Sequence, residues 1–288
     1  MMQGSKEEQR KHWLFNRFQY MDSKWNSGDA LNQVIQLRGY AKANITVTPY
    51  ADIYPTVKYG SYVVQTRGAH DQASTLINPL ETVNDTEIYI YSAQQIKSIG
   101  DLSAMQVGFA DFSQAINLQG TLKLGDSSEQ YENQRLDNLT LGSNKKLGVL
   151  DVRNCKALGT GDQKTVDLSG CEGLTAAYFD GTKITGATMP NGGALETLHL
   201  PSTITSLILL NQKSISDLIA PTAGLSTLRI ENCPTVNTKA LLNACPEYTR
   251  VRLVGFTWEA EDAEEIEALL DTLDTMRGLD ENGIVLTL

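Results

Sequence analysis

Short segments of the form L-x-x-L-x-L recur along the middle of the chain. Clear copies occupy residues 136–141 (LDNLTL), 147–152 (LGVLDV), 195–200 (LETLHL), 204–209 (ITSLIL) and 225–230 (LSTLRI). The alternation of apolar and polar residues that ends each copy is typical of a strand with one buried face. Copies begin about 10 or 11 residues apart, whereas a complete coil needs 20 or more. We therefore expect two strand-bearing sides in each coil.

The ninth position of several copies holds a residue that suits a turn. These residues are Asn144, Cys155, Cys171 and Cys233. Asn or Cys at this position satisfies backbone groups that the bend leaves unpaired. A repeat with this pattern and this ending resembles the leucine-rich repeat, and the resemblance covers about half of the chain. It implies a solenoid whose stacked rungs bury one continuous core, with Leu139, Leu150, Leu168, Leu198, Leu207 and Leu228 buried together.

Two copies are weaker than the others. They occupy residues 184–189 and 215–220, and Pro190 and Pro221 end their strand pattern. Residues 237–245 (NTKALLNAC) instead predict a short helix with Asn237 or Thr238 at its N-cap and Pro246 beyond its end. We expect this helix on the convex side of the coil, before the last strand.

The first 95 residues show a different pattern. Residues 7–26 place an aromatic face at helical spacing, made of Leu14, Phe18, Met21 and Trp25. Residues 33–92 change to strand composition, and alternation such as residues 87–91 (EIYIY) predicts antiparallel strands with one buried face. We expect a small β domain that closes the N-terminal edge of the solenoid. Its aromatics are either core residues or a peptide- or glycan-contact surface made by Tyr50, Tyr54, Tyr59 and Tyr62.

The last 30 residues predict a cap. Residues 259–276 combine apolar residues at helical spacing with eight acids, and residues 284–288 read as a terminal strand. The acids form either the solvated outer face of a capping helix or a cation or partner site. Leu288 ends the chain inside an apolar run, so we expect truncation or processing at this end.

These patterns together predict the fold class and the domains. The expected fold is β-rich (α+β): a leucine-rich-repeat-like β-solenoid with an N-terminal helix-plus-antiparallel-β domain and a C-terminal capping helix. The expected domains are residues 1–95, the aromatic helix and small β domain; residues 96–258, the solenoid; and residues 259–288, the acidic capping helix and terminal strand.

Charge narrows the possible partners. The chain of 288 residues has 24 Lys+Arg against 34 Asp+Glu, a formal net charge of −10. A protein this acidic is a poor candidate for neutralising the phosphates of nucleic acid or of anionic lipid. No run of 18 apolar residues predicts a membrane span, and the polar residues 1–11 lack the apolar core of a signal peptide. We expect no nucleic-acid partner and no membrane span.

Candidate catalytic and cofactor motifs are incomplete. Residues 179–182 (FDGT) have Tyr178 where a phosphotransferase would need its nucleophilic Asp, and residues 159–164 (GTGDQK) lack the full phosphate-loop pattern. The four cysteines show no C-x-x-C spacing and predict buried reduced thiols. His199 lies between two leucines and has no nucleophile fixed beside it by a motif. We expect no catalytic, metal or cofactor-binding residue, and a protein that is not an enzyme.

The residue between the last two apolar positions of each copy points outward, and stacked copies align these residues in rows. If alternate copies share a side, one row is Asp151, Tyr178, His199, Ile219 and Arg252. The other row is Thr140, Asp167, Thr188, Ile208 and Arg229. The first row is the candidate partner-binding surface, because Tyr, His and Arg combine apolar area with polar groups. The alternative is a solvated strand face without a partner.

A second resemblance concerns function. The segments KHWLFNRFQYMDSKW, LRGYAKANITVTPYADIYPTVKYGSYVVQTRG, NDTEIYIYSA and LDTMRGLDENG resemble parts of large structural proteins of tailed bacteriophages and prophages of gut bacteria. The resemblance implies a virion or tail component, located in the phage particle, that assembles with a protein partner or attaches to a host receptor. The alternative is a leucine-rich-repeat adhesin on a bacterial surface that binds a host protein or glycan. The sequence leaves the oligomeric state open.

Overall fold

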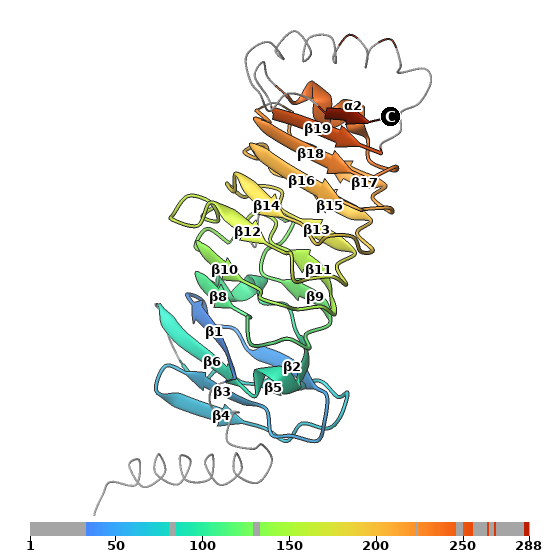
Figure 1. Cartoon of the computed structure of the whole chain (residues 1–288). Helices are drawn as coiled ribbons and strands as arrows, with labels where there is room; N and C mark the ends of the chain where they lie inside the picture. Colours follow the sequence, from blue (N-terminus) through green and yellow to red (C-terminus); the bar gives the residue numbers. More distant parts are fainter. Residues whose placement is uncertain are drawn as a thin grey trace, which may run out of the picture.

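The structure is a computed structural model. It describes residues 33–80, 85–128, 133–222, 224–245, 250–255 and 285–287, together with positions 264 and 268. Figure 1 shows strands stacked in a column, from β3 and β4 at one end to β18 and β19 at the other. The fold consists of two layers of strands that face each other along this column.

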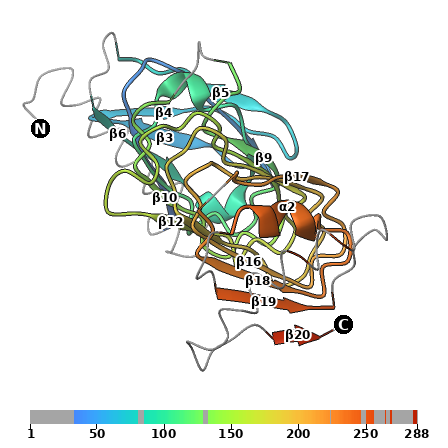
Figure 2. The ribbon, with the colours of Figure 1, turned by 90° about the horizontal axis from the view of Figure 1, so that it is seen from above.

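Two parallel sheets form the coiled part of the column. One, called here the β9–β17 sheet, contains in spatial order β9 (Gly120–Lys123), β11 (Leu147–Asp151), β13 (Ala176–Tyr178), β15 (Thr197–His199) and β17 (Asp217–Ile219). The other, the β12–β20 sheet, contains β12 (Thr165–Asp167), β14 (Gly186–Thr188), β16 (Ser206–Leu210), β18 (Thr227–Glu231), β19 (Arg250–Val254) and β20 (Val285–Thr287). Figure 2, viewed along the column, shows β9 and β17 on one side and β16 to β19 on the other. From β11 to β18 consecutive strands alternate between the sheets, which confirms the prediction of two strand-bearing sides per coil.

Antiparallel strands continue both layers toward the N-terminal end. A six-stranded sheet contains β10 (Asn138–Thr140), β8 (Phe109–Asp111), β1 (Val34–Gly39), β6 (Thr86–Tyr91), β3 (Thr56–Tyr59) and β4 (Tyr62–Gln65), and only its β8–β10 pair is parallel. A three-stranded sheet contains β5 (Ser74–Leu76), β2 (Ile45–Pro49) and β7 (Ile96–Ile99). Because β7 lies beside β9 and β10 beside β12, each antiparallel sheet extends one layer of the coil.

The core is continuous between the layers. One hydrophobic cluster of buried residues extends from Ile35 to Leu253. The prediction of a shared leucine core is confirmed, because all six leucines named for it belong to this cluster. In the antiparallel part, the buried Tyr59 hydroxyl donates a hydrogen bond to the Leu76 carbonyl and accepts one from the Ile45 backbone N–H. Burial raises the pKa of Tyr59 to about 12.

The turns are stabilised by the Asn and Cys side chains that follow the strands. The buried Asn144 side chain donates to the Phe112 and Leu141 carbonyls, and Cys233 accepts a hydrogen bond from the backbone N–H of Gln212. The sequence prediction for the ninth position is therefore confirmed at these two turns. On the outside of the turns, Asn232 donates to the side chain of Asn211 in the preceding coil.

The predicted helix after β18 is present. It is α2 (Thr238–Asn243), and the side chain of Asn237 accepts a hydrogen bond from the backbone N–H of Ala240, as an N-cap does. Since β18 and β19 belong to the same sheet, α2 takes the part of the coil where a strand of the β9–β17 sheet would come. This replacement ends the alternation between the two sheets.

The predicted fold class is wrong. Among the described residues from 33 to 222 there is no α-helix, only the 3-10 turns η1 (Ala93–Gln95) and η2 (Ser103–Met105), so the N-terminal residues that the structure describes, from 33 on, form strands and not a helix packed with strands. The physical reason is the two-residue apolar alternation on both sides of the core, which makes each layer a sheet. The expected aromatic helix at 7–26 lies outside the described residues.

The C-terminal cap is also corrected. The β12–β20 sheet ends in β20, which lies within the terminal strand predicted at 284–288 and pairs parallel to β19, so this strand, rather than the expected helix, continues the sheet beyond β19. The acidic segment 259–276 lies outside the described residues except for positions 264 and 268. The two weak copies form strands, β14 and β17, despite the prolines that follow them. The division of the chain at residues 95 and 258 stays a prediction.

Candidate functional site

The candidate row lies on the outer side of the β9–β17 sheet. Register pairs Lys123 with Asp151, Asp151 with Tyr178, Tyr178 with His199, and His199 with Ile219. The sequence therefore placed Asp151, Tyr178, His199 and Ile219 correctly in one row, and the structure adds Lys123 at its N-terminal end.

Arg252 lies elsewhere. It pairs with Arg229 across β18 and β19, in the opposite layer, and both guanidinium groups contact the Glu231 carboxylate. Counting alternate copies misplaced Arg252. The helix α2 lies where a strand of the β9–β17 sheet would come, so the next strand, β19, pairs with β18 in the same sheet. Asp167, Thr188, Ile208 and Arg229 form the second row as expected. Thr140 is instead paired with Asp111 of β8 in the N-terminal sheet.

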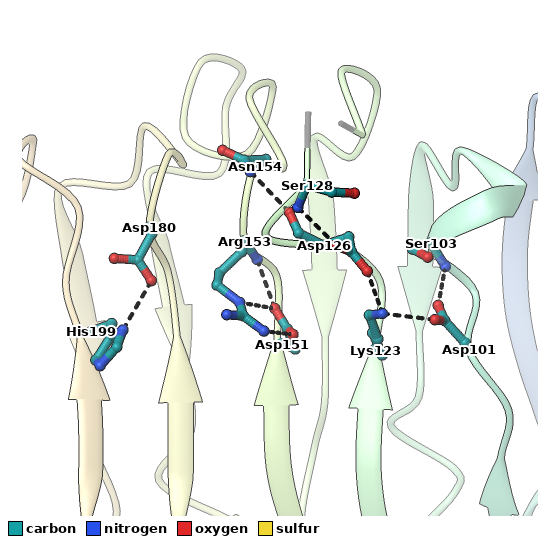
Figure 3. A network of polar contacts seen from close by, with 10 residues as sticks. All are labelled: Asp101, Ser103, Lys123, Asp126, Ser128, Asp151, Arg153, Asn154, Asp180 and His199. Atoms are coloured by element: carbon teal, nitrogen blue, oxygen red, sulfur yellow. Dashed lines mark hydrogen bonds and ion pairs between the residues drawn. The ribbon is translucent and has the colours of Figure 1, made fainter. Parts of the chain in front are cut away.

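Lys123 begins a line of polar contacts along the first row. Its ammonium group lies 2.8 Å from a carboxylate oxygen of Asp101 and also binds Asp126. Figure 3 shows these groups beside one another at the carboxyl ends of the strands. The hydrogen bond from Lys123, together with one from the Ser128 backbone N–H, lowers the pKa of Asp126 to about 2. The two carboxylates raise the pKa of Lys123.

The next contacts join Asp151 to Tyr178. Asp151 points outward but is buried, because Arg153 covers it with two hydrogen bonds of 3.0 and 2.6 Å. This bidentate pairing raises the pKa of Arg153. The same guanidinium lies over the Tyr178 ring, 4.6 Å from its centroid, in a cation–π contact.

His199 links three successive strands. Its ring meets the Tyr178 ring edge-on, with centroids 5.0 Å apart. Nδ1 lies 3.2 Å from Oδ2 of Asp180, and Nε2 lies 3.1 Å from Oδ2 of Asp217. Asp180 follows β13 and Asp217 begins β17, so the imidazole bridges its two neighbouring coils (Figure 3 shows the Asp180 side). Both ring nitrogens therefore lie within hydrogen-bonding distance of a carboxylate oxygen.

These residues form one continuous surface, called here the polar strip: Asp101, Lys123, Asp126, Asp151, Arg153, Tyr178, Asp180, His199, Asp217 and Ile219. Ile219 closes it with an apolar side chain, since the residue is 44% exposed. Every charged group of the strip already has a partner within it. The arrangement is therefore suited to holding a fixed pattern of charge and aromatic surface.

The sequence analysis missed six of the ten residues of the strip. Arg153 and Asp180 lie two residues after row members, and Asp217 lies two residues before Ile219. The two-residue strand period that aligned the row also puts these side chains on the same face, so the signal was present. Lys123 was missed because its segment, residues 118–124 (LQGTLKL), has one extra residue before the final L-x-L, and the β9–β11 register is irregular at this point.

Other candidate groups are engaged or buried. Lys164 of the glycine-containing segment donates to the Gly159 and Thr160 carbonyls of its own loop. All four cysteines are free thiols; burial raises the pKa of Cys171 to about 11 and also raises that of Cys155. In the part of the chain that the structure describes, no group of three or more His, Cys, Asp or Glu residues is placed to hold a metal ion.

The four tyrosines of the N-terminal part have different environments. Tyr59 is fully buried and belongs to the core. Tyr50 is half-buried and donates a hydrogen bond to the Asn117 carbonyl. Tyr54 and Tyr62 are exposed. Because Tyr59 is buried, the four tyrosines do not form the common contact surface that the sequence left open as an alternative.

Comparisons with protein-family models, curated proteins and solved structures give no match to this chain. Within the described residues, no helix has the length and apolar character needed to cross a membrane.

Proposed function

We propose that this protein is a non-enzymatic structural or attachment protein that contacts a protein partner through the polar strip. The observation that carries the proposal is the alignment of Asp151, Tyr178, His199 and Ile219 across four adjacent strands. Tyrosine, histidine and arginine side chains supply contact area together with hydrogen-bonding groups, and tyrosine and arginine are enriched at interface hot spots.

The contacts between side chains of the strip support a binding role. Arg153 holds Asp151 and covers the Tyr178 ring, while two carboxylates hold the imidazole of His199. Side chains fixed before binding lose less conformational entropy when a partner arrives. A surface of this kind gives an attachment protein its binding energy without any catalytic group.

We propose that the protein acts in a phage tail or particle, because several of its segments resemble tailed-phage structural proteins. The test is to purify particles from the encoding phage or induced prophage and to quantify the protein in them. Recovery of the protein in the bacterial surface fraction, and not in particles, would contradict the virion role and favour the surface adhesin.

The strip is tested with matched variants on the two layers. Tyr178→Ala combined with Ile219→Ala removes contact area from the strip, and Arg229→Ala combined with Arg252→Ala does so on the opposite layer. We expect the first pair to reduce incorporation into particles or attachment to cells, and the second pair to leave them near wild type. Urea unfolding of each variant shows whether the fold is kept. Equal behaviour of two folded variants would contradict the strip as the contact surface.

A further inference from the structure

The charge that the polar strip presents to solvent is negative. Its cations are largely covered: the side chain of Lys123 is 27% exposed and that of Arg153 is 28% exposed. Three of its carboxylates are more open, with side-chain exposures of 49% for Asp101, 35% for Asp180 and 60% for Asp217. Lys123 and Arg153 therefore mainly form ion pairs within the strip, and an approaching molecule contacts the exposed acids first.

The formal charges of the strip also sum to a negative value. Five carboxylates of the strip, including Asp126 and Asp151, stand against the two cations Lys123 and Arg153. His199 lies between two of the most exposed acids, with only 17% of its side chain exposed. Apolar contact is available beside these acids, from Ile219 and from the ring of Tyr178.

We propose that the partner docked on this sheet face is a basic protein segment, whose Lys or Arg side chains pair with Asp180 and Asp217 while their aliphatic stems pack on Tyr178 and Ile219. This inference rests on the proposed binding function and names the class of its partner. Charge complementarity favours this occupant: a polyanion would be repelled by the exposed acids, and a neutral glycan could donate hydrogen bonds to them but would gain no attraction between opposite charges. Long basic side chains also fit a surface that alternates acidic and apolar groups.

The test uses acetylated octalysine amide as the probe, with octaglutamate and the neutral oligosaccharide maltoheptaose as comparisons. Binding to the full chain is measured by calorimetry at low and at moderate ionic strength. We expect octalysine to bind, octaglutamate and maltoheptaose not to bind, and the octalysine affinity to fall as salt screens the charges.

Variants separate the strip from the overall acidity of the chain. Asp180→Asn with Asp217→Asn removes two strip charges, and Glu264→Gln with Glu265→Gln removes two charges from the C-terminal acidic segment. We expect the strip pair to weaken octalysine binding by about tenfold, because it removes two ion pairs with the probe, and the control pair to weaken it by less than about twofold. The single variant Asp217→Asn, at the most exposed acid, gives a smaller loss if the double variant does not fold.

Two results would overturn the inference. Equal weakening by the strip pair and the control pair would show binding to net charge alone, and binding of maltoheptaose without octalysine would show a glycan surface. Either result leaves the particle and attachment test of Tyr178→Ala with Ile219→Ala unaffected, so failure of the basic-partner inference is distinguishable from failure of the proposed function.

Discussion

Asp126 shows how one side chain of the strip connects folding to pH. Its carboxylate accepts hydrogen bonds from Lys123 and from the Ser128 backbone, and these lower its pKa to about 2 in the folded protein. The pKa of an Asp in an unfolded chain is about 3.9. The folded state thus binds the proton less readily than the unfolded state, so Asp126 stabilises the protein above about pH 4 and this contribution is lost as the pH falls toward 2.

We expect Asp126→Asn to lower the free energy of unfolding at pH 6 and to narrow its difference from wild type as the pH falls from about 4 to about 2. Urea unfolding at a series of pH values measures both effects. Asp162→Asn removes an exposed acid from a loop and serves as the control. If the difference in free energy of unfolding between Asp126→Asn and wild type stays constant down to pH 2, the lowered pKa of Asp126 does not stabilise the fold.

Gly159 is fixed by its backbone and by its neighbours. Its φ is +98°, and an added Cβ would lie 2.1 Å from the carbonyl carbon of Lys183. Gly224 has a similar φ of +89° but no atom within 4 Å of the same position. The two glycines therefore separate backbone strain from steric overlap.

We expect Gly224→Ala to destabilise the protein by about 1–2 kcal/mol through strain alone, and Gly159→Ala to cost about 3 kcal/mol or more. Chemical denaturation of the two variants gives the comparison. Similar losses for both would show that the chain near Lys183 moves aside at little cost.

For single residues, the sequence predicts some positions of the strip and misplaces or misses others. Tyr178 and His199 were aligned correctly, because the two-residue period and the repeat spacing are local properties of the strands. Arg252 was not, because its layer depends on α2 replacing a strand one half-coil earlier. The ion pair between Asp217 and His199 was missed, because alternation places Asp217 on the outer face but does not give the side-chain distances between neighbouring coils.

At the scale of elements, the joint between β10 and β12 depends on one side chain. Gln163 accepts a hydrogen bond from the Leu139 backbone N–H at 2.7 Å and donates one to the Leu139 carbonyl at 2.8 Å. The amide thus satisfies the edge of β10 as a neighbouring strand would. It connects the last strand of the N-terminal sheet to the loop that leads into β12.

We expect Gln163→Leu to leave both Leu139 backbone groups without this partner and to cost about 1–3 kcal/mol. The specific readout is amide hydrogen exchange, which should become faster at Leu139 while remaining slow at Leu228, in the distant strand β18. Unchanged protection of Leu139 in a folded Gln163→Leu variant would argue that water or another group replaces the amide.

The sequence predicts the strands better than it predicts the fold class. Alternation identified strands in both parts of the chain, and even the proline-bounded copies form β14 and β17. The expectation of an α+β arrangement is wrong for the described N-terminal residues, which form sheets in both layers. In the structure each antiparallel sheet continues one layer of the coil, so the opposite layer covers it and no helix is required for its core.

At the scale of the whole molecule, the continuous core has a consequence for unfolding. Repeat arrays gain much of their stability from contacts between neighbouring units, so units that share a core unfold together. Buried residues from Ile35 in β1 to Leu253 in β19 belong to one hydrophobic cluster. We therefore expect a single cooperative transition for the described part of the chain, although its strands are antiparallel at one end and parallel at the other.

Two core variants test this expectation. Leu198 in β15 and Ile90 in β6 are both fully buried, and replacing either by Ala should cost about 2–5 kcal/mol through lost contacts and a cavity. Thr197→Ala, at a half-buried outward position next to Leu198, should cost within about 0.5 kcal/mol. In calorimetry, both core variants should lower the midpoint of the same transition, because each weakens a core that the two parts share. Two transitions, each lowered by only one variant, would instead show that the antiparallel sheets and the coil fold as separate units, and would support a domain boundary near residue 95.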